Sequence, residues 1–234
     1  MSEQPAEPQN RAPLGALIAF AAVALLAIAV FVVVILTRSS TPPADPQTSV
    51  HSEGGAAIVD PAQQSTGVTN VEPLAISSIP LQSSTGGEVS LTDFAGRYVV
   101  LYFGYTYCPD FCPTTLTDFR LTQRQLGADA ERVTFVMISV DPKRDTPAVL
   151  QTYLARFDPT FIGLTGDVET LKQVADEFGA FFLSHDTGDS EYYMVDHTAT
   201  KFLVDPEGRW VAQYAYGTPV DVMAADLKAR LSDS

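Results

Sequence analysis

Residues 102–113 read YFGYTYCPDFCP and contain both cysteines of the 234-residue chain, Cys108 and Cys112. The apolar run before the loop has the composition of a buried strand, and Pro113 suits the first position of a helix. Two sulfurs therefore lie beside a helix N-terminus, where unpaired N–H groups and the helix dipole favour thiolate. Because a disulfide across three intervening residues closes little chain entropy, we expect these cysteines to carry chemistry rather than stability.

The segments around this loop alternate between strand and helix patterns. Thr146 and Asp167 are expected helix caps, and Pro147 is an expected first helical residue. The pattern predicts a hairpin formed by 76–81 and 88–91, strands at 98–103, 133–140, 161–164, 192–195, 200–204 and 209–214, and helices at 113–126, 147–157, 168–178 and 220–231. This order indicates an α/β sandwich around a mixed sheet. A cysteine pair after the first long strand indicates a thioredoxin-like fold, here with an N-terminal β-hairpin extension.

An uncharged and almost wholly apolar run of 24 residues occupies positions 14–37. At about 1.5 Å per residue it exceeds the roughly 30 Å hydrocarbon core of a bilayer, and it is too long for the apolar region of a signal peptide. We therefore predict a transmembrane anchor at 14–37 behind a short tail at 1–13. A Ser-, Thr- and Pro-rich flexible linker at 38–70 and a folded domain at 71–234 follow. The expected location is the cell membrane, with a single span and the C-terminal domain on the extracytoplasmic side.

The charge balance is strongly acidic, with 28 Asp and Glu against 14 Lys and Arg and a formal net charge of −14. Binding nucleic acid needs basic surface that displaces counterions, so nucleic acid is not an expected partner. A cationic or metal-bearing partner suits this charge. The alternative is that acidity only keeps the domain soluble.

The spacing of the cysteines departs from the Cys-x-x-Cys of thioredoxin-type enzymes by one additional residue, which lets both sulfurs face one metal ion. Two thiolates are soft ligands that select Cu(I), and one imidazole would complete a three-coordinate site. Of the three histidines, His51 lies in the linker and His185 in a polar segment, whereas His197 lies between two strand-like runs. We therefore expect Cys108, Cys112 and His197 to be the metal ligands.

Three motifs in this order resemble the Sco/SenC proteins of cytochrome c oxidase assembly. They are CPDFCP at 108–113, SVDPKRDTP at 139–147 and VDH at 195–197, with His197 placed 89 positions after Cys108. The resemblance covers roughly residues 70–231, and the predicted anchor also fits it. It implies a membrane-tethered copper metallochaperone of thioredoxin-like fold.

By this resemblance Cys108, Cys112 and His197 bind copper, which is delivered to the dinuclear copper site of cytochrome c oxidase subunit II. The family is also linked to reduction of the receiving cysteines, so the same pair is expected to be redox-active. Asp141 and Asp145 are expected either as turn and cap residues or as part of the site. Asp196 is expected to orient a nearby group, although neighbours on an extended chain point to opposite sides.

Three alternative interpretations of the cysteine pair predict different chemistry. A thiol-disulfide oxidoreductase of the thioredoxin superfamily needs the cysteines and no metal. A peroxidase relies on other residues around its cysteine, and this sequence has no clear match to them. Zinc is a competing metal, since two cysteines, one histidine and a water form a catalytic zinc site. Tyr102, Tyr105 and Tyr107 are expected to pack around the loop.

Overall fold

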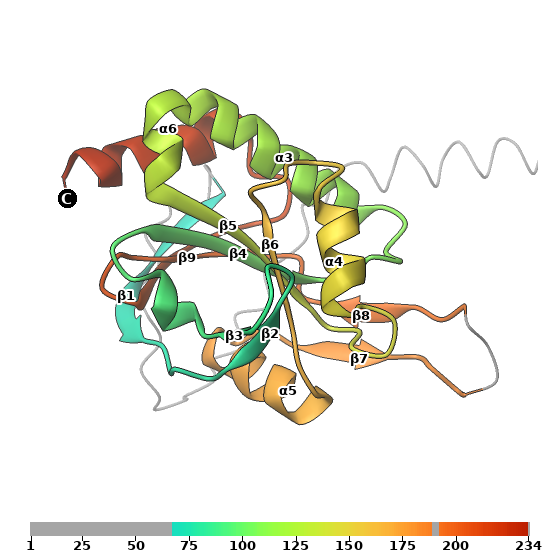
Figure 1. Cartoon of the computed structure of the whole chain (residues 1–234). Helices are drawn as coiled ribbons and strands as arrows, with labels where there is room; N and C mark the ends of the chain where they lie inside the picture. The colour runs from blue at the N-terminus through green and yellow to red at the C-terminus, as the bar shows by residue number, and fades with distance from the viewer. Residues whose placement is uncertain (1–66, 189–191, 234) are drawn as a thin grey trace, which may run out of the picture. The chain divides into compact units, whose positions relative to one another are not determined.

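The computed structural model describes residues 67–188 and 192–233 (Figure 1). The predicted tail, the predicted anchor at 14–37, most of the predicted linker and His51 lie outside these residues. Within the described part of the chain, no helix is both long enough and apolar enough to cross a bilayer. The anchor therefore stays a prediction from the sequence.

Strand β4 (Tyr98–Gly104) lies at the centre of the sheet, and all of its residues are buried. It pairs in parallel with β5 (Val133–Ser139) and antiparallel with β9 (Lys201–Val204). A strand covered on both faces reads as a continuous apolar run, and this is why β4 and β5 were recognisable in the sequence.

The main sheet has eight strands in the order β1-β10-β9-β4-β5-β6-β2-β3. Its other strands are β1 (Val68–Ala75), β2 (Leu81–Ser83), β3 (Glu88–Val89), β6 (Ile162–Thr165) and β10 (Arg209–Tyr214). Only the β4–β5 and β5–β6 pairs are parallel. The prediction of a mixed sheet is therefore confirmed.

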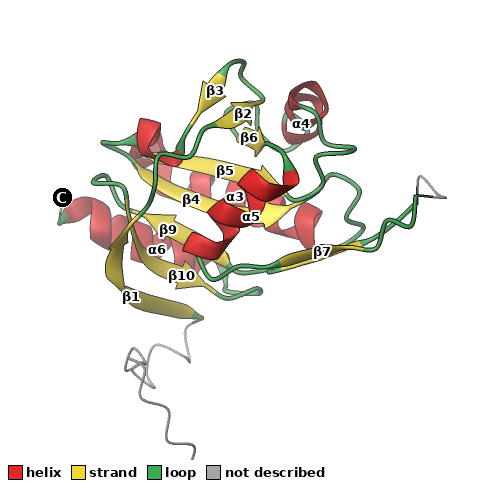
Figure 2. Cartoon of the chain, turned by 90° about the horizontal axis from the view of Figure 1, so that it is seen from below, coloured by secondary structure: helices red, strands yellow, loops and turns green. Residues whose placement is uncertain are grey.

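Helices cover both faces of this sheet. Figures 1 and 2 show α3 (Phe111–Leu126), α4 (Pro147–Leu154) and α6 (Val220–Ser232) on one face and α5 (Val168–Glu177) on the other. Two 3₁₀ segments, Leu91–Phe94 and Gly127–Arg132, precede β4 and β5. The side chains of Thr146 and Asp167 accept from the N–H groups of Val149 and Thr170, which confirms both predicted caps.

Two aromatic clusters fill the space between the sheet and its helices. On the α3 face, Phe119 packs against Tyr102, Phe135 and Phe161, with ring centroids 5.1 to 6.2 Å apart. On the α5 face the cluster consists of Phe103, Phe178, Phe202 and Trp210. Successive residues of β4 thus contribute to opposite faces, as the alternation of a strand requires.

A separate two-stranded ribbon, formed by β7 (Phe182–Ser184) and β8 (Val195–His197), extends away from the main sheet (Figures 1 and 2). The ribbon carries His197. The sequence predicts a strand at 192–195 and a loop at His197. The observed strand begins three residues later and includes His197, so that boundary was wrong, and β7 was not predicted. Ribbon strands this short have too few residues for alternation to identify them.

Three further boundaries differ from the prediction. Strand β1 begins at Val68, inside the predicted linker, because its residues are mostly exposed and show no regular alternation of apolar and polar side chains. The N-terminal hairpin is confirmed only as the short β2–β3 pair, and the preceding residues 76–80 form no strand. Helix α3 begins at Phe111, so Pro113 is its third residue; Pro is tolerated there because first-turn N–H groups have no intrahelical partner.

Candidate metal centre

The loop between β4 and α3 is held by Asp145. This carboxylate is fully buried and accepts from the N–H of Thr106 at 2.9 Å, the Thr106 hydroxyl at 2.5 Å and the Ser139 hydroxyl at 2.7 Å. Burial raises the pKa of Asp145, and these hydrogen bonds oppose that rise. Of the two roles expected for Asp145, the structure supports a place in the site, because it ties the cysteine loop to the end of β5.

Cys108 and Cys112 are both buried and both free thiols, with Cys112 in the first turn of α3. The Cys112 thiol, helped by the N–H groups of Asp110 and Cys112, lowers the pKa of Cys108, and burial opposes this effect. The same hydrogen bond to Cys108, together with burial, raises the pKa of Cys112. The two shifts have opposite directions, so the reduced pair favours a thiolate on Cys108 and a thiol on Cys112.

Gly104, the last residue of β4, allows this close approach. A Cβ at Gly104 would lie 2.5 Å from Tyr102 Cε2 and 2.8 Å from Cys112 Sγ, closer than real Cβ contacts come. The missing side chain leaves room for the sulfur against the strand.

His197 completes the group from the end of β8. Its Nε2 lies 3.6 Å from Cys112 Sγ, and its Nδ1 lies 3.2 Å from the carbonyl oxygen of Thr198. Because a carbonyl oxygen only accepts, we assign the ring proton to Nδ1, which leaves the lone pair of Nε2 toward the sulfurs. A carbonyl that fixes the tautomer in this way is the usual arrangement for a metal-binding imidazole.

The Sγ atoms of Cys108 and Cys112 and a ring nitrogen of His197 all lie within 4.8 Å of one another. Three ligands about 2.3 Å from one ion lie about 4 Å apart, so small shifts would bring all three onto a single metal. Two thiolates and one imidazole are a donor set that suits Cu(I), and zinc is compatible with the same set. The structure thus brings together the three ligands expected from the sequence.

A clasp, formed by Asp141, Arg144 and Tyr193, joins the loop after β5 to the ribbon that carries His197. The Tyr193 hydroxyl donates to Asp141 at 2.6 Å, and Arg144 Nε also donates to Asp141. The Arg144 guanidinium lies 3.5 Å from the centre of the Tyr193 ring and 4.6 Å from that of Tyr107. Asp141 is therefore part of the support of the site.

Tyr105 makes a second connection to the ribbon. Its hydroxyl accepts from the N–H of Val195 at 3.3 Å, and its ring meets the His197 ring edge-on at 5.7 Å. The sequence suggested only that Tyr105 packs. Arg144 lies in the SVDPKRDTP motif, and Tyr193 lies two residues before VDH. No sequence signal indicates that these two side chains are in contact.

Asp196 and His185 do not take part in the metal group. Asp196 Oδ2 lies 2.8 Å from His185 Nε2 on an exposed part of the ribbon. The carboxylate thus orients His185 rather than His197, because neighbouring residues of β8 face opposite sides.

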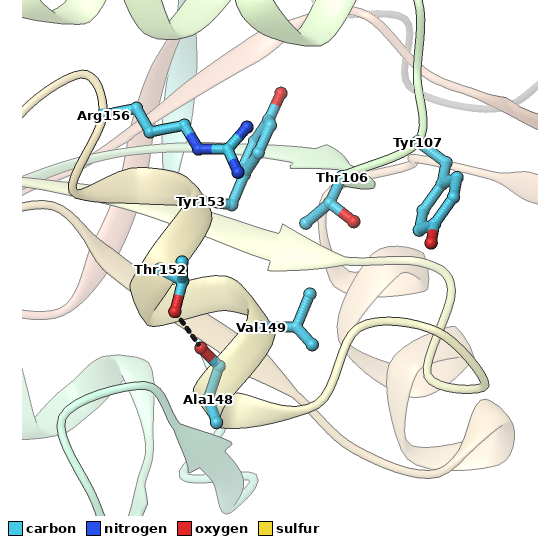
Figure 3. Close-up of a pocket in the computed structure, with 7 residues that line it drawn as sticks. All are labelled: Thr106, Tyr107, Ala148, Val149, Thr152, Tyr153 and Arg156. Carbon is cyan, nitrogen blue, oxygen red and sulfur yellow. Dashed lines mark hydrogen bonds between the residues drawn. The ribbon is translucent and has the colours of Figure 1, made fainter.

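A pocket of about 510 Å³ lies beside the cysteine loop, but none of the three candidate ligands lines it. Figure 3 shows Thr106 and Tyr107 on the loop side and residues of the α4 region opposite, namely Ala148, Val149, Thr152, Tyr153 and Arg156. The Thr152 hydroxyl donates to the carbonyl of Ala148 at 3.0 Å, as drawn. The pocket is distinct from the metal centre.

The fold and this site define a thioredoxin-like protein whose two cysteines and one histidine form a candidate metal group. The profile of the SCO1/SenC family matches residues 74–232. The chain therefore belongs to the SCO1/SenC family, and the family resemblance noted in the sequence is confirmed.

Individual relatives agree with this assignment. The SCO2-like protein of Rickettsia conorii is 38% identical over 140 residues, which cover 58% of this chain and 68% of that protein. The structure of Bradyrhizobium japonicum ScoI with copper bound is 36% identical, with a TM-score of 0.61, and the match covers 66% of this chain and 98% of that one. BsSco, a member of the Sco family of cytochrome c oxidase assembly proteins with a disulfide switch, is 26% identical, with a TM-score of 0.54, over 67% of this chain and 93% of its own.

Proposed function

We propose that this protein is a copper metallochaperone that holds copper through Cys108, Cys112 and His197. The observation that carries the proposal is the convergence of two sulfurs and one imidazole nitrogen within 4.8 Å. Copper is the cargo, and three ligands leave a coordination position through which an incoming ligand can take over the metal. The copper-bound relative supports the choice of copper over zinc.

Copper titration of the protein and of four single variants tests this site. We expect Cys108→Ser, Cys112→Ser and His197→Ala each to lose the parent's thiolate-to-Cu(II) absorption band and to bind Cu(I) at least tenfold more weakly. His185→Ala is the matched control, because His185 lies on the same ribbon and faces away from the sulfurs. Parent-like binding by His197→Ala would contradict the ligand assignment.

The proposed recipient is the dinuclear copper site of cytochrome c oxidase subunit II, and other copper-handling proteins are proposed as sources of the metal. The membership of BsSco in a family of oxidase assembly proteins supports this choice. Mixing the copper-loaded protein with the metal-free soluble domain of subunit II should generate the absorption spectrum of the dinuclear centre. If copper stays on the donor at equilibrium, the delivery role is wrong.

The proposed location is the cell membrane, with a span at residues 14–37 and the copper domain on the extracytoplasmic side. The length and apolar composition of that run support it. The full chain should sediment with membranes after alkaline washing, and a chain without residues 14–37 should not. The domain should also be cleaved by protease added outside spheroplasts; protection there would contradict the orientation.

Thiol-disulfide exchange is the second candidate function, and the paired thiolate and thiol at Cys108 and Cys112 favour it. The thiolate on Cys108 would attack a disulfide of the target, and Cys112 would then resolve the mixed disulfide, so the target is reduced and the pair becomes oxidised. Insulin reduction by the metal-free protein measures this activity. Activity that survives His197→Ala and disappears in Cys108→Ser would support it.

A further inference from the structure

The phenol of Tyr102 is buried without a partner. Tyr102 is 1% exposed, and its hydroxyl has no hydrogen-bond partner among the described residues. Buried hydroxyls are nearly always paired, so an unpaired one needs an explanation. Tyr102 lies on β4 with its ring edge-on to Phe119 of α3.

The sulfur of Cys112 is the acceptor within its reach. Tyr102 Cε2 and Cζ and Cys112 Sγ all lie within 3.2 Å of the point that a Cβ of Gly104 would occupy, so the phenol ring and the sulfur are neighbours across Gly104. Burial raises the pKa of Tyr102, so the phenol keeps its proton and can donate it in a hydrogen bond.

The strength of this hydrogen bond depends on whether the Cys112 sulfur is a free thiol or a metal-bound thiolate. A thiol sulfur is a weak acceptor, and a thiolate is a strong one. A cysteine binds copper as a thiolate, so bound copper would place a strong acceptor beside the unpaired hydroxyl of Tyr102.

We propose that Tyr102 is a positioning residue whose hydroxyl donates a hydrogen bond to the Cys112 sulfur when that sulfur is a copper-bound thiolate. The inference rests on the proposed copper function. The hydrogen bond withdraws electron density from the sulfur and stabilises the metal-bound form relative to the metal-free one.

The test is Tyr102→Phe in the full chain, with Tyr214→Phe as the matched control. Tyr214 is equally buried on the same sheet, but its hydroxyl donates to Asp226 at 2.7 Å. In Tyr102→Phe we expect the thiolate-to-Cu(II) band to move to longer wavelength and Cu(I) to bind about fivefold to tenfold more weakly. The metal-free form should be at least as resistant to urea as the parent, because it loses no hydrogen bond.

Tyr214→Phe should show the opposite pattern, with a less stable metal-free form and an unchanged copper band. The inference is overturned if Tyr102→Phe keeps the parent's band and affinity, or if its only defect is a less stable metal-free fold. If the parent itself shows no thiolate-to-copper band, the proposed function fails and this inference falls with it. If the parent shows the band and Tyr102→Phe shows the same band and the same Cu(I) affinity, this inference is wrong and the proposed function still stands.

Discussion

At the scale of single residues, the site depends on how one proton is shared between two sulfurs. The Cys112 thiol lowers the pKa of Cys108, and the Cys108 thiolate in turn raises the pKa of Cys112. Gly104 permits the packing, and the carbonyl of Thr198 assigns the His197 proton to Nδ1. Each candidate ligand thus has a neighbouring group that sets its protonation or its position.

The shared proton predicts a pH dependence of stability in the reduced, metal-free protein. Unfolded cysteines titrate near pH 8.5. Below that pH the unfolded chain carries a proton on Cys108 that the folded chain has lost. The free energy of unfolding therefore rises with pH in this range. Above about 8.5, unfolded Cys112 loses a proton that the folded protein retains, so stability falls.

We therefore expect the free energy of unfolding contributed by the pair to be greatest near pH 8.5, the ordinary cysteine value. Urea denaturation under reducing conditions, at steps of pH, measures it as the difference between the parent and Cys108→Ser/Cys112→Ser. A difference that does not vary with pH would show that the pair does not share a proton in this way.

At the scale of elements, two connections place the ribbon over the cysteine loop. The clasp of Asp141, Arg144 and Tyr193 ties the ribbon to the loop after β5, and Tyr105 ties β8 to the cysteine loop itself. The Lys143–Asp186 pair at 2.7 Å adds a solvent-exposed contact. His197 is therefore held near the sulfurs before any metal arrives, which reduces the ordering cost of binding.

The clasp predicts that Tyr193→Phe weakens copper binding without touching a ligand. The variant keeps the ring beneath Arg144 and removes only the hydrogen bond to Asp141, worth about 1 kcal/mol or somewhat more for a charged acceptor. We expect a threefold to tenfold loss of Cu(I) affinity, of the order that 1 kcal/mol gives. Amide hydrogen exchange across β8 should become faster.

Tyr192→Phe is the control for that experiment, because it makes the same chemical change one residue earlier. Its side chain is 86% exposed, so we expect affinity and exchange to stay at parent values. Equal exchange rates in Tyr193→Phe and the parent would show that the clasp does not restrain the ribbon.

At the scale of the whole molecule, the copper domain is completed by β1, which pairs with β10 at one edge of the sheet. Val68 is buried, and the carbonyl of Gly67 accepts from the N–H of Ala215 at 2.8 Å and from the Thr218 hydroxyl at 2.9 Å. The predicted domain start at residue 71 would cut through this strand.

A chain that begins at residue 71 should be less stable than one that begins at residue 67. It loses the Val68 side chain from the core and both hydrogen bonds to Gly67, which together contribute about 2–4 kcal/mol. Urea denaturation of the two metal-free chains measures the difference, and Cu(I) affinity should be equal in both because β1 is separated from β4 by two strands. Equal stability would show that β1 adds nothing to the fold.

Local sequence signals are sufficient to predict several elements of this fold. Buried β4 and β5 appear as continuous apolar runs, Thr146 and Asp167 mark helix starts, and the cysteine loop follows from the composition of residues 102–113. The sequence also predicts the three candidate ligands that the structure brings together, because soft ligands at that spacing, taken with the family motifs, leave few alternatives.

Other features depend on contacts between distant segments, which no local pattern contains. The pairing of β1 with β10 and the formation of the ribbon depend on partners more than 10 residues away, and neither the irregular β1 nor the three-residue ribbon strands carry a clear pattern of their own. The same holds for the hydrogen bond from Thr106 to Asp145, for the clasp, and for the packing of Tyr102 beside Cys112. A side chain's hydrogen-bond partner is a matter of position in space, so sequence spacing alone does not reveal it.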